Sequence, residues 1–460
     1  MGWQPDRAVA RAAVEYLTPV PTRSSSYGSA SLGDEYLPAT GNGGYAVEHY
    51  DLALDYRVAT NRLSATAVIT ARATMRLERF SLDFASLSVE KVTVDGERPR
   101  KTTHASRKLT VTLDTAIDDG DEFEIVVRYR GAPRPIRGRW GDLGWEELTD
   151  GVLVASQPNG ASSWFPCNDH PSDKATYRIS LACESPYTVL ANGELISRTA
   201  RSGRTTWVFD TLEPMASYLA TIQIGRYTSA QLGTEPVVQT AYFPPNLARV
   251  VAVDFERLGD MLALFCERFG PYPFSSYSVV VTADELEIPL EAHGLAVFGR
   301  NHIDGAHSSD RLIAHELAHQ WFGNSLTITR WRDIWLHEGF ACYSEWLWAE
   351  ESGGPTIGRS VAEHHRVVAA LPQDLVVGDP GPADMFDDRI YKRGALALHA
   401  VRVQLGDRRF FEALRAFVAA HRHAGISTAG FVSFFAGYAE DGVIEQLVDR
   451  WVFSAPLPPL

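Results

Sequence analysis

The sequence is poor in cysteine, has no long apolar stretch and carries no surplus of positive charge. Only 4 of its 460 residues are cysteine, and no CxxC spacing occurs, which argues against a disulfide framework and a cysteine zinc site. No apolar run reaches about 18 residues, the length that a transmembrane helix needs. The net charge of −14 argues against a nucleic-acid backbone as the main partner, and more weakly against anionic membranes.

The N-terminal segment has no secretory signal. It reads MGWQPDRAVARAAVEYL, which contains charged residues and no uninterrupted apolar core. We therefore expect a cytoplasmic protein, although a secreted form numbered after removal of a leader would have the same sequence. Residues 1–45 are polar and rich in small residues. We expect a short helix near 6–17, followed by a linker or by an arm that wraps around the body.

Two regions with different periodicity follow. Between about 46 and 228, short alternating runs such as HYDLALDYRV and KATYRISLAC are separated by Gly, Pro, Asp and Asn, which predicts an all-β domain built as a sandwich or a large curved sheet. From 229 to 460, helical periodicity dominates, with one strand at SYSVVVTAD. We expect one helix over LARVVAVDFERLGDMLALFCERFG and another that is capped by Ser308 or Ser309 and stops at Gly323. The fold class is thus α+β and multidomain.

The helix after Ser308 carries the motif His315-Glu316-Leu317-Ala318-His319. Two histidines four residues apart project from one helix face, so both rings can reach a single cation. Glu316 adjoins the first ligand and is placed to act on a metal-bound water. The alternative is a solvated helix that happens to carry these residues.

A third metal ligand is offered by the helix that contains WLHEGFACYSE. Glu338 follows His319 at the HExxH-x18-E spacing, and a loop with Gly323 and Asn324 would return the chain to the metal. His337 is the alternative ligand, but it points about 100° away from Glu338, so we expect it to pack beside the site. Glu345 lies two turns after Glu338 on the same face, where it can accept the second ring N–H of a ligand histidine or be a surface charge.

The remaining histidine pairs predict no second metal site. His364 and His365 lie on a predicted helix, and His421 and His423 lie near a helix end. We expect these side chains to be exposed.

These motifs give the chain a family resemblance. HELAHQWFGN followed by WLHEGFACYSE resembles the aminopeptidase N family of zinc peptidases, the gluzincins with an HExxH-x18-E site. FPCNDHPSDKATYRISL and GNGGYAVEHYDLALDY resemble segments of the β domain of that family, so the resemblance covers about 45–460. It implies a thermolysin-like catalytic domain over 229–460, one Zn²⁺ per chain, and peptide substrates with a free N-terminus.

The family implies a carboxylate that binds the substrate's α-ammonium group. It lies in a Gly-x-Met-Glu-Asn segment before the zinc helix, and the matching text here is IPLEAHGL, in which only the glutamate and the later Gly-Leu agree. The resemblance therefore assigns the amine anchor to Glu291. A second anchor in many relatives corresponds to Gln157 and Asn159, which turn chemistry alone would also explain. We expect the pocket beside Leu290 and Gln157 to select the first residue of the substrate.

The family also implies a tyrosine that stabilises the oxyanion, in a Tyr-x-Lys-Gly segment at a helix start. Tyr391 matches it, with Arg in place of Lys. Many relatives continue with a C-terminal helical domain that closes over the site. We expect this chain to lack that domain and to have a more open cleft, or one closed by another subunit or by the N-terminal arm.

The resulting prediction is an aminopeptidase in which Glu316 is the general base. A thermolysin-like endopeptidase is the first alternative, because it would not need Glu291 and would accept blocked N-termini. A non-catalytic peptide-binding scaffold and an enzyme for a non-peptide substrate are the others.

Overall fold

Residues 26–460 are described by the computed structural model. The first of two units is all β and comprises three sheets, with strand orders β13-β14-β11-β1-β2-β7-β4, β12-β15-β10-β9-β8 and β3-β6-β5. Its strands are β1 (Tyr45–Arg57), β2 (Arg62–Ala73), β3 (Leu77–Asp83), β4 (Ser88–Val94), β5 (Lys101–Ala105), β6 (Lys108–Ile117), β7 (Glu122–Gly131), β8 (Ile136–Gly138), β9 (Gly141–Leu148), β10 (Gly151–Ala155), β11 (Lys174–Glu184), β12 (Thr188–Ala191), β13 (Glu194–Arg201), β14 (Arg204–Ala216) and β15 (Ile222–Gly225).

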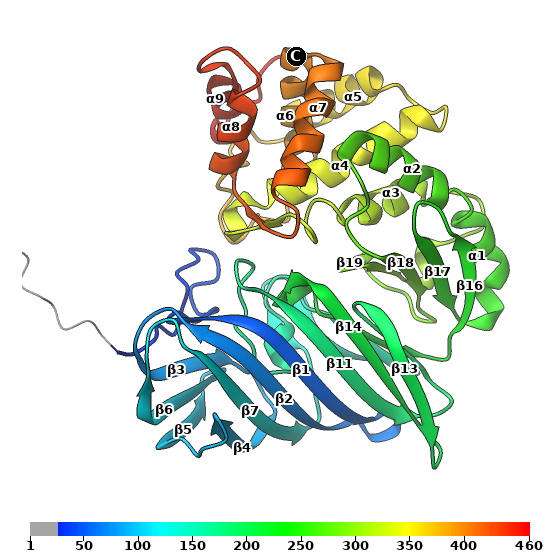
Figure 1. The fold of residues 1–460 in the computed structure, drawn as a ribbon. Coiled ribbons are helices and arrows are strands. Elements are labelled where there is room, and N and C mark those ends of the chain that lie inside the picture. Colours follow the sequence, from blue (N-terminus) through cyan, green and yellow to red (C-terminus); the bar gives the residue numbers. More distant parts are fainter. Residues whose placement is uncertain (1–25) are drawn as a thin grey trace, which may run out of the picture.

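Alternating sequence explains why the large sheet is curved around a core. In β1 and β11, every second side chain is buried, as the two-residue repeat of a strand requires. β1 pairs parallel to β11 and antiparallel to β2. Figure 1 shows this sheet as a long curved surface that lies below the helices.

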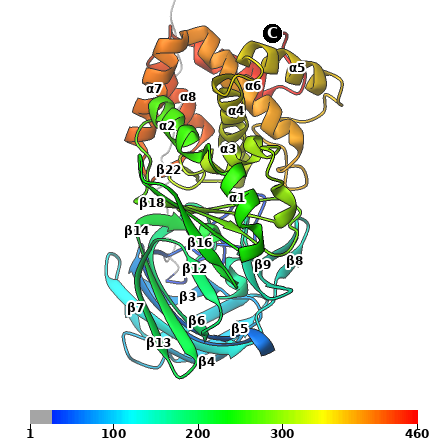
Figure 2. The same cartoon turned by 90° about the vertical axis from the view of Figure 1, so that its right-hand side faces the viewer.

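The second unit combines helices with a small sheet of order β16-β17-β18-β20-β19 and the two-stranded β21-β22. Its helices are α1 (Ala248–Asp254), α2 (Leu258–Phe269), α3 (Asp310–Ala318), α4 (Trp335–Glu351), α5 (Ile357–Ala369), α6 (Asp388–Leu405), α7 (Asp407–Ala420), α8 (Thr428–Ala436) and α9 (Val443–Val448). Its strands are β16 (Thr228–Gly233), β17 (Val238–Phe243), β18 (Ser276–Val281), β19 (Leu290–Ala292), β20 (Leu295–Phe298), β21 (Thr327–Ile328) and β22 (Gly425–Ile426). Figure 2 shows β16 and β18 between the large sheet and the helices.

The predicted fold class, an all-β domain followed by a mainly helical one with a small sheet, is confirmed. Our boundary between 228 and 229 falls at the start of β16 and stays a prediction. The helix predicted near 6–17 lies outside the described residues. No helix within 26–460 is both long and apolar enough to cross a membrane.

Two predicted helix bounds were wrong. The helix expected over 247–270 is broken into α1 and α2, because Asp254 ends α1 and its buried carboxylate accepts the backbone N–H groups of Asp304, Gly305 and His307. The helix expected to stop at Gly323 ends at Ala318. Beyond it the backbone tightens, because Gln320 and Trp321 donate to carbonyls three residues back, and Nδ1 of His319 donates to the carbonyl of Phe322.

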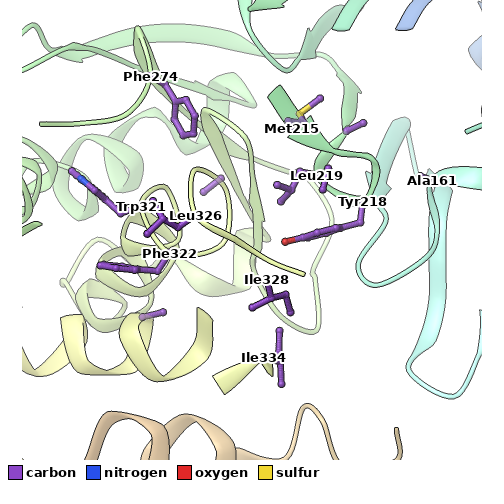
Figure 3. Close-up of a cluster of buried hydrophobic side chains, with 14 of the residues drawn as sticks. Ala161, Met215, Tyr218, Leu219, Phe274, Trp321, Phe322, Leu326, Ile328 and Ile334 are labelled. Atoms are coloured by element: carbon purple, nitrogen blue, oxygen red, sulfur yellow. The ribbon is translucent and has the colours of Figure 1, made fainter. Parts of the chain in front are cut away.

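An apolar contact holds the loop after α3 against the β domain. Figure 3 shows Tyr218 and Leu219, which follow β14, close to Ile328 and Ile334 of the second unit. The ring of Tyr218 packs edge-on against Trp331, with 5.2 Å between the centroids. Burial of these large side chains fixes the segment between α3 and α4.

The arm also joins the two units. Asp34 accepts the backbone N–H of Trp331, and the Tyr36 hydroxyl donates to Asp379. Within 26–45 no residue lines the catalytic cavity described below. Closure of the cleft by the arm or by another subunit stays a prediction.

Candidate metal centre and active site

Three side chains from two helices converge on one point. His315 lies on α3, His319 directly follows that helix, and Glu338 lies in the first turn of α4. Oε2 of Glu338 is 3.4 Å from Nε2 of His315 and 3.5 Å from Nε2 of His319. All three side chains are buried. The chain therefore returns to His315 and His319 after the loop that contains Gly323 and Asn324, as the sequence predicts.

The second ring nitrogen of each histidine is already engaged. Nδ1 of His315 is 2.8 Å from Oε1 of Glu345, and Nδ1 of His319 donates to the carbonyl of Phe322 at 3.0 Å. Both Nε2 atoms are thus turned toward Glu338. Two histidines and one glutamate, oriented by outer hydrogen bonds, form a ligand set that zinc takes in catalytic sites. Glu345 is bonded to His315, and its role behind a metal ligand stays a prediction.

The buried charges shift one another's protonation. Burial acts to lower the pKa of His315, but the carboxylates of Glu338 and Glu345 outweigh it and raise that pKa to about 10. The same balance raises the pKa of His319 to about 9. Burial acts to raise the pKa of Glu345, but its bond to His315 lowers it to about 2. A metal ion at the two Nε2 atoms must displace protons, so its affinity rises with pH.

Glu316 has the properties of a general base. It is 4 % exposed, and its Oε2 has no hydrogen-bond partner among residues 26–460. Burial raises its pKa to about 7, against the opposing effect of the two histidines. A buried carboxylate with a pKa near neutrality, beside a metal site, is suited to accept and return a proton.

Glu291 lies on β19, the edge strand of the small sheet. Acceptor atoms of Glu291, Glu316 and His319 lie within 4.8 Å of one another. Gln157, from the β domain, donates to Oε1 of Glu291 at 2.8 Å. Burial and the nearby Glu338 raise the pKa of Glu291, against the two histidines. An ammonium group bound here would relieve that repulsion between carboxylates.

A cavity of about 300 Å³ joins these groups. Gln157, Glu291, Glu316 and Tyr391 lie on its wall with the three metal ligands and Glu345. Tyr391 is in the first turn of α6, and its ring is 6.0 Å from that of His315 at an interplanar angle of 19°. Burial and the surrounding glutamates raise its pKa, so the hydroxyl keeps its proton.

Two residues that were predicted to contact the substrate do not line the cavity. Leu290 and Asn159 are not among the cavity-lining residues. Leu290 precedes Glu291 on a strand, so its side chain points to the other face, where it packs against an apolar cluster. Asn159 lies in the turn that follows β10. His337, the alternative ligand, accepts the backbone N–H of Ile328 with Nε2, so this nitrogen is already used.

The sequence analysis missed several residues of the cavity wall. They are Ile288, Pro289, Arg311, Leu312, Phe386, Asp388 and Lys392. Helical spacing could have found Arg311, because it lies one turn before His315, and Asp388, because it lies one turn before Tyr391. Phe386 also contacts Trp140 from the turn between β8 and β9, at 6.3 Å between centroids, and no local signal predicts this contact.

The fold and this ligand geometry define the class of metallopeptidases. A model of the peptidase family M1 domain matches residues 253–451, and a model of the M1 N-terminal domain matches 46–219. An M1 zinc metallopeptidase from Deinococcus radiodurans superposes with a TM-score of 0.85 at 30 % identity, over 94 % of this chain and 99 % of that one. The chain belongs to peptidase family M1.

Curated relatives extend this result. Aminopeptidase N of Oryctolagus cuniculus is 26 % identical over 396 residues, which is 76 % of this chain and 40 % of that protein. A probable M1 family aminopeptidase of Encephalitozoon cuniculi is 26 % identical over 345 residues, 66 % of this chain and 38 % of that protein. The chain thus spans about two-fifths of the length of these relatives. A variant of the Deinococcus radiodurans protein is described as bound to a Tyr-Ser-Ala substrate. The predicted aminopeptidase N resemblance is confirmed, and the predicted zinc cofactor agrees with these descriptions.

Proposed function

We propose that the chain is a zinc-dependent aminopeptidase that hydrolyses the first peptide bond of peptides with a free N-terminus. The observation that carries this proposal is the position of Glu291, on a free sheet edge and within 4.8 Å of the base Glu316 and the ligand His319. A carboxylate there can hold a terminal ammonium group one residue away from the metal. The edge of β19 is also free to pair with an extended peptide.

His315, His319 and Glu338 would hold the zinc ion, which supplies Lewis acidity: it acidifies water and polarises a carbonyl oxygen. Glu316 accepts the proton of the attacking water and passes it to the leaving amine. The hydroxyl of Tyr391 donates a hydrogen bond to the oxyanion. Glu291, oriented by Gln157, binds the α-ammonium group and so sets the position of the cut. Glu345 holds the His315 ring in place.

The experiment compares aminoacyl fluorogenic amides with their N-acetylated counterparts, with and without a chelator. We expect cleavage of free-amine substrates only, which the chelator abolishes and zinc restores. Glu291→Gln should lower kcat/KM on these substrates about 10- to 100-fold, since it removes a charge-assisted hydrogen bond. Glu287→Gln, an exposed residue just before the same strand, is the matched control.

Equal cleavage of acetylated substrates would remove the anchor role of Glu291 and favour a thermolysin-like endopeptidase. Failure to cleave either set, with zinc bound, would favour a binding scaffold or a non-peptide substrate. The location in the cytoplasm stays a prediction from the sequence.

A further inference from the structure

One part of the cavity wall carries two cations, whose charged neighbours are Glu345 and Asp388 and not Glu291. Arg311 lies on α3 one turn before His315, and Lys392 follows Tyr391 on α6. Both line the same cavity as the amine anchor and the metal ligands. The cations share this part of the wall with Glu345 and Asp388, while Glu291 is grouped with Glu316 and His319.

Arg311 keeps donors for a ligand. Its Nη1 lies 3.1 Å from both oxygens of Glu345, the residue that also holds His315. Within 26–460, Nε and Nη2 of Arg311 have no hydrogen-bond partner. The side chain lines the cavity and is 58 % exposed, so a ligand in the cavity can reach it.

Lys392 is a poorly paired ammonium group. Its side chain is only 13 % exposed, but its one hydrogen bond within the described chain goes to Sγ of Cys342 at 3.6 Å. Burial raises the pKa of that thiol well above its usual range, so the sulfur is neutral and a weak acceptor. Asp388 is 3.8 Å away, beyond hydrogen-bond distance, and 71 % exposed. The charges of Glu345 and Asp388 also act on the ammonium group and help to raise its pKa against burial, but neither carboxylate hydrogen-bonds it. An incoming carboxylate supplies the strong acceptor that this largely buried group lacks.

We propose that Arg311 and Lys392 form a carboxylate-binding subsite that selects peptides with a negative charge just beyond the scissile bond. The carboxylate comes from an acidic second residue or from the C-terminus of a dipeptide. This inference rests on the proposed function, because the ammonium group at Glu291 sets the direction of the peptide. An extended chain advances about 3.3–3.6 Å per residue, so the second residue of a bound peptide lies one step beyond the scissile bond.

The test uses peptides that share the first residue cleaved best in the aminoacyl panel. One set is X-Glu-Ala-amide, X-Gln-Ala-amide and X-Lys-Ala-amide, and the other is X-Ala as free acid and as amide. We expect kcat/KM for the Glu peptide to exceed that for the Gln peptide about tenfold, with the Lys peptide lowest. In the second set, a preference for the free acid would identify the C-terminal carboxylate as a ligand too.

Lys392→Met should bring the Glu-to-Gln ratio close to one, and Arg311→Gln should reduce it. The control Lys101→Met, on an exposed strand of the β domain, should keep the wild-type ratio. The preference should also weaken in high salt, because exposed charges are screened.

Equal rates in both sets of peptides, or a ratio that Lys392→Met leaves intact, would overturn the subsite while leaving the aminopeptidase proposal standing. If no free-amine peptide is cleaved, the proposed function and the subsite are both overturned.

Discussion

Two clusters of histidines differ in their partners. In the metal cluster (His315, His319, Glu338, Glu345), each histidine has a carboxylate oxygen within 3.5 Å, and the histidine pKa values are raised to about 10 and about 9. In the interdomain cluster (Lys174, His293, His337, His423), burial and the neighbouring cations lower the pKa values of the histidines. The pKa of His337 falls to about 3 and that of His423 to about 4.

The difference teaches that carboxylates, not histidines, decide which cluster can bind a cation. Lys174 is the centre of the interdomain cluster: its Nζ donates to the carbonyls of Asn324 and Ser325, and it faces His293, His337 and His423. Both ring nitrogens of His293 are buried without a partner in the described chain. A divalent ion here would add charge to a region that already disfavours it. The metal cluster has negative charge to spare, including Glu316 and Glu291.

The largest expected effect comes from the base of the metal cluster. Glu316→Gln should lower kcat about 10³- to 10⁴-fold, because the amide cannot accept the proton of water. Zinc content should stay at the wild-type level, since Glu316 is not a ligand. Steady-state kinetics and metal analysis of the same preparation measure both. A variant that keeps a tenth of the wild-type kcat would rule out this role.

A smaller loss is expected from Tyr391→Phe, which keeps the ring beside His315 but removes the oxyanion donor. We expect kcat to fall about 10²- to 10³-fold with little change in KM. Tyr438→Phe, on the segment after α8, is a matched control. A change confined to KM would assign Tyr391 to substrate binding instead.

The interdomain cluster predicts an effect on stability rather than on rate. Burial lowers the pKa of Lys174 from 10.5 to about 7, so between these pH values the unfolded chain binds more protons than the folded one. The free energy of unfolding should therefore rise with pH over this range. Urea unfolding of Lys174→Met should lack this increment, while Lys101→Met should keep it. Parallel pH profiles for wild type and Lys174→Met would contradict the account.

The metal ligands could be predicted from the sequence because helix periodicity fixes them locally. His315 and His319 share a face, and the same periodicity separates Glu338 from His337 and aligns Glu345. The two-domain architecture followed from strand and helix periodicity. Tyr391 and Glu291 came only from the family resemblance.

The other features of the site and of the domain interface could not be predicted, because they depend on contacts between segments that are distant in the sequence. Gln157 reaches Glu291 across the domain interface, and Lys174 bonds the loop after α3 from the β domain. No local pattern reports such contacts. The four histidines that were expected to be exposed are all partly buried: His364, His365, His421 and His423. Aromatic rings cover two of them, since His364 stacks on Trp346 and His423 lies beside Phe274, with 4.9 and 5.7 Å between the ring centroids. Leu290 was expected beside the substrate because it adjoins Glu291. On a strand, however, adjacent side chains point to opposite faces.

The most direct test is zinc stoichiometry in three variants, measured on proteins dialysed against limiting zinc. The account predicts one zinc per chain in the wild type and in His337→Gln, and loss of zinc in His319→Gln and Glu338→Gln. Retention of zinc by Glu338→Gln together with its loss from His337→Gln would contradict it, because the metal would then be held by the histidine that the structure assigns to the interdomain cluster.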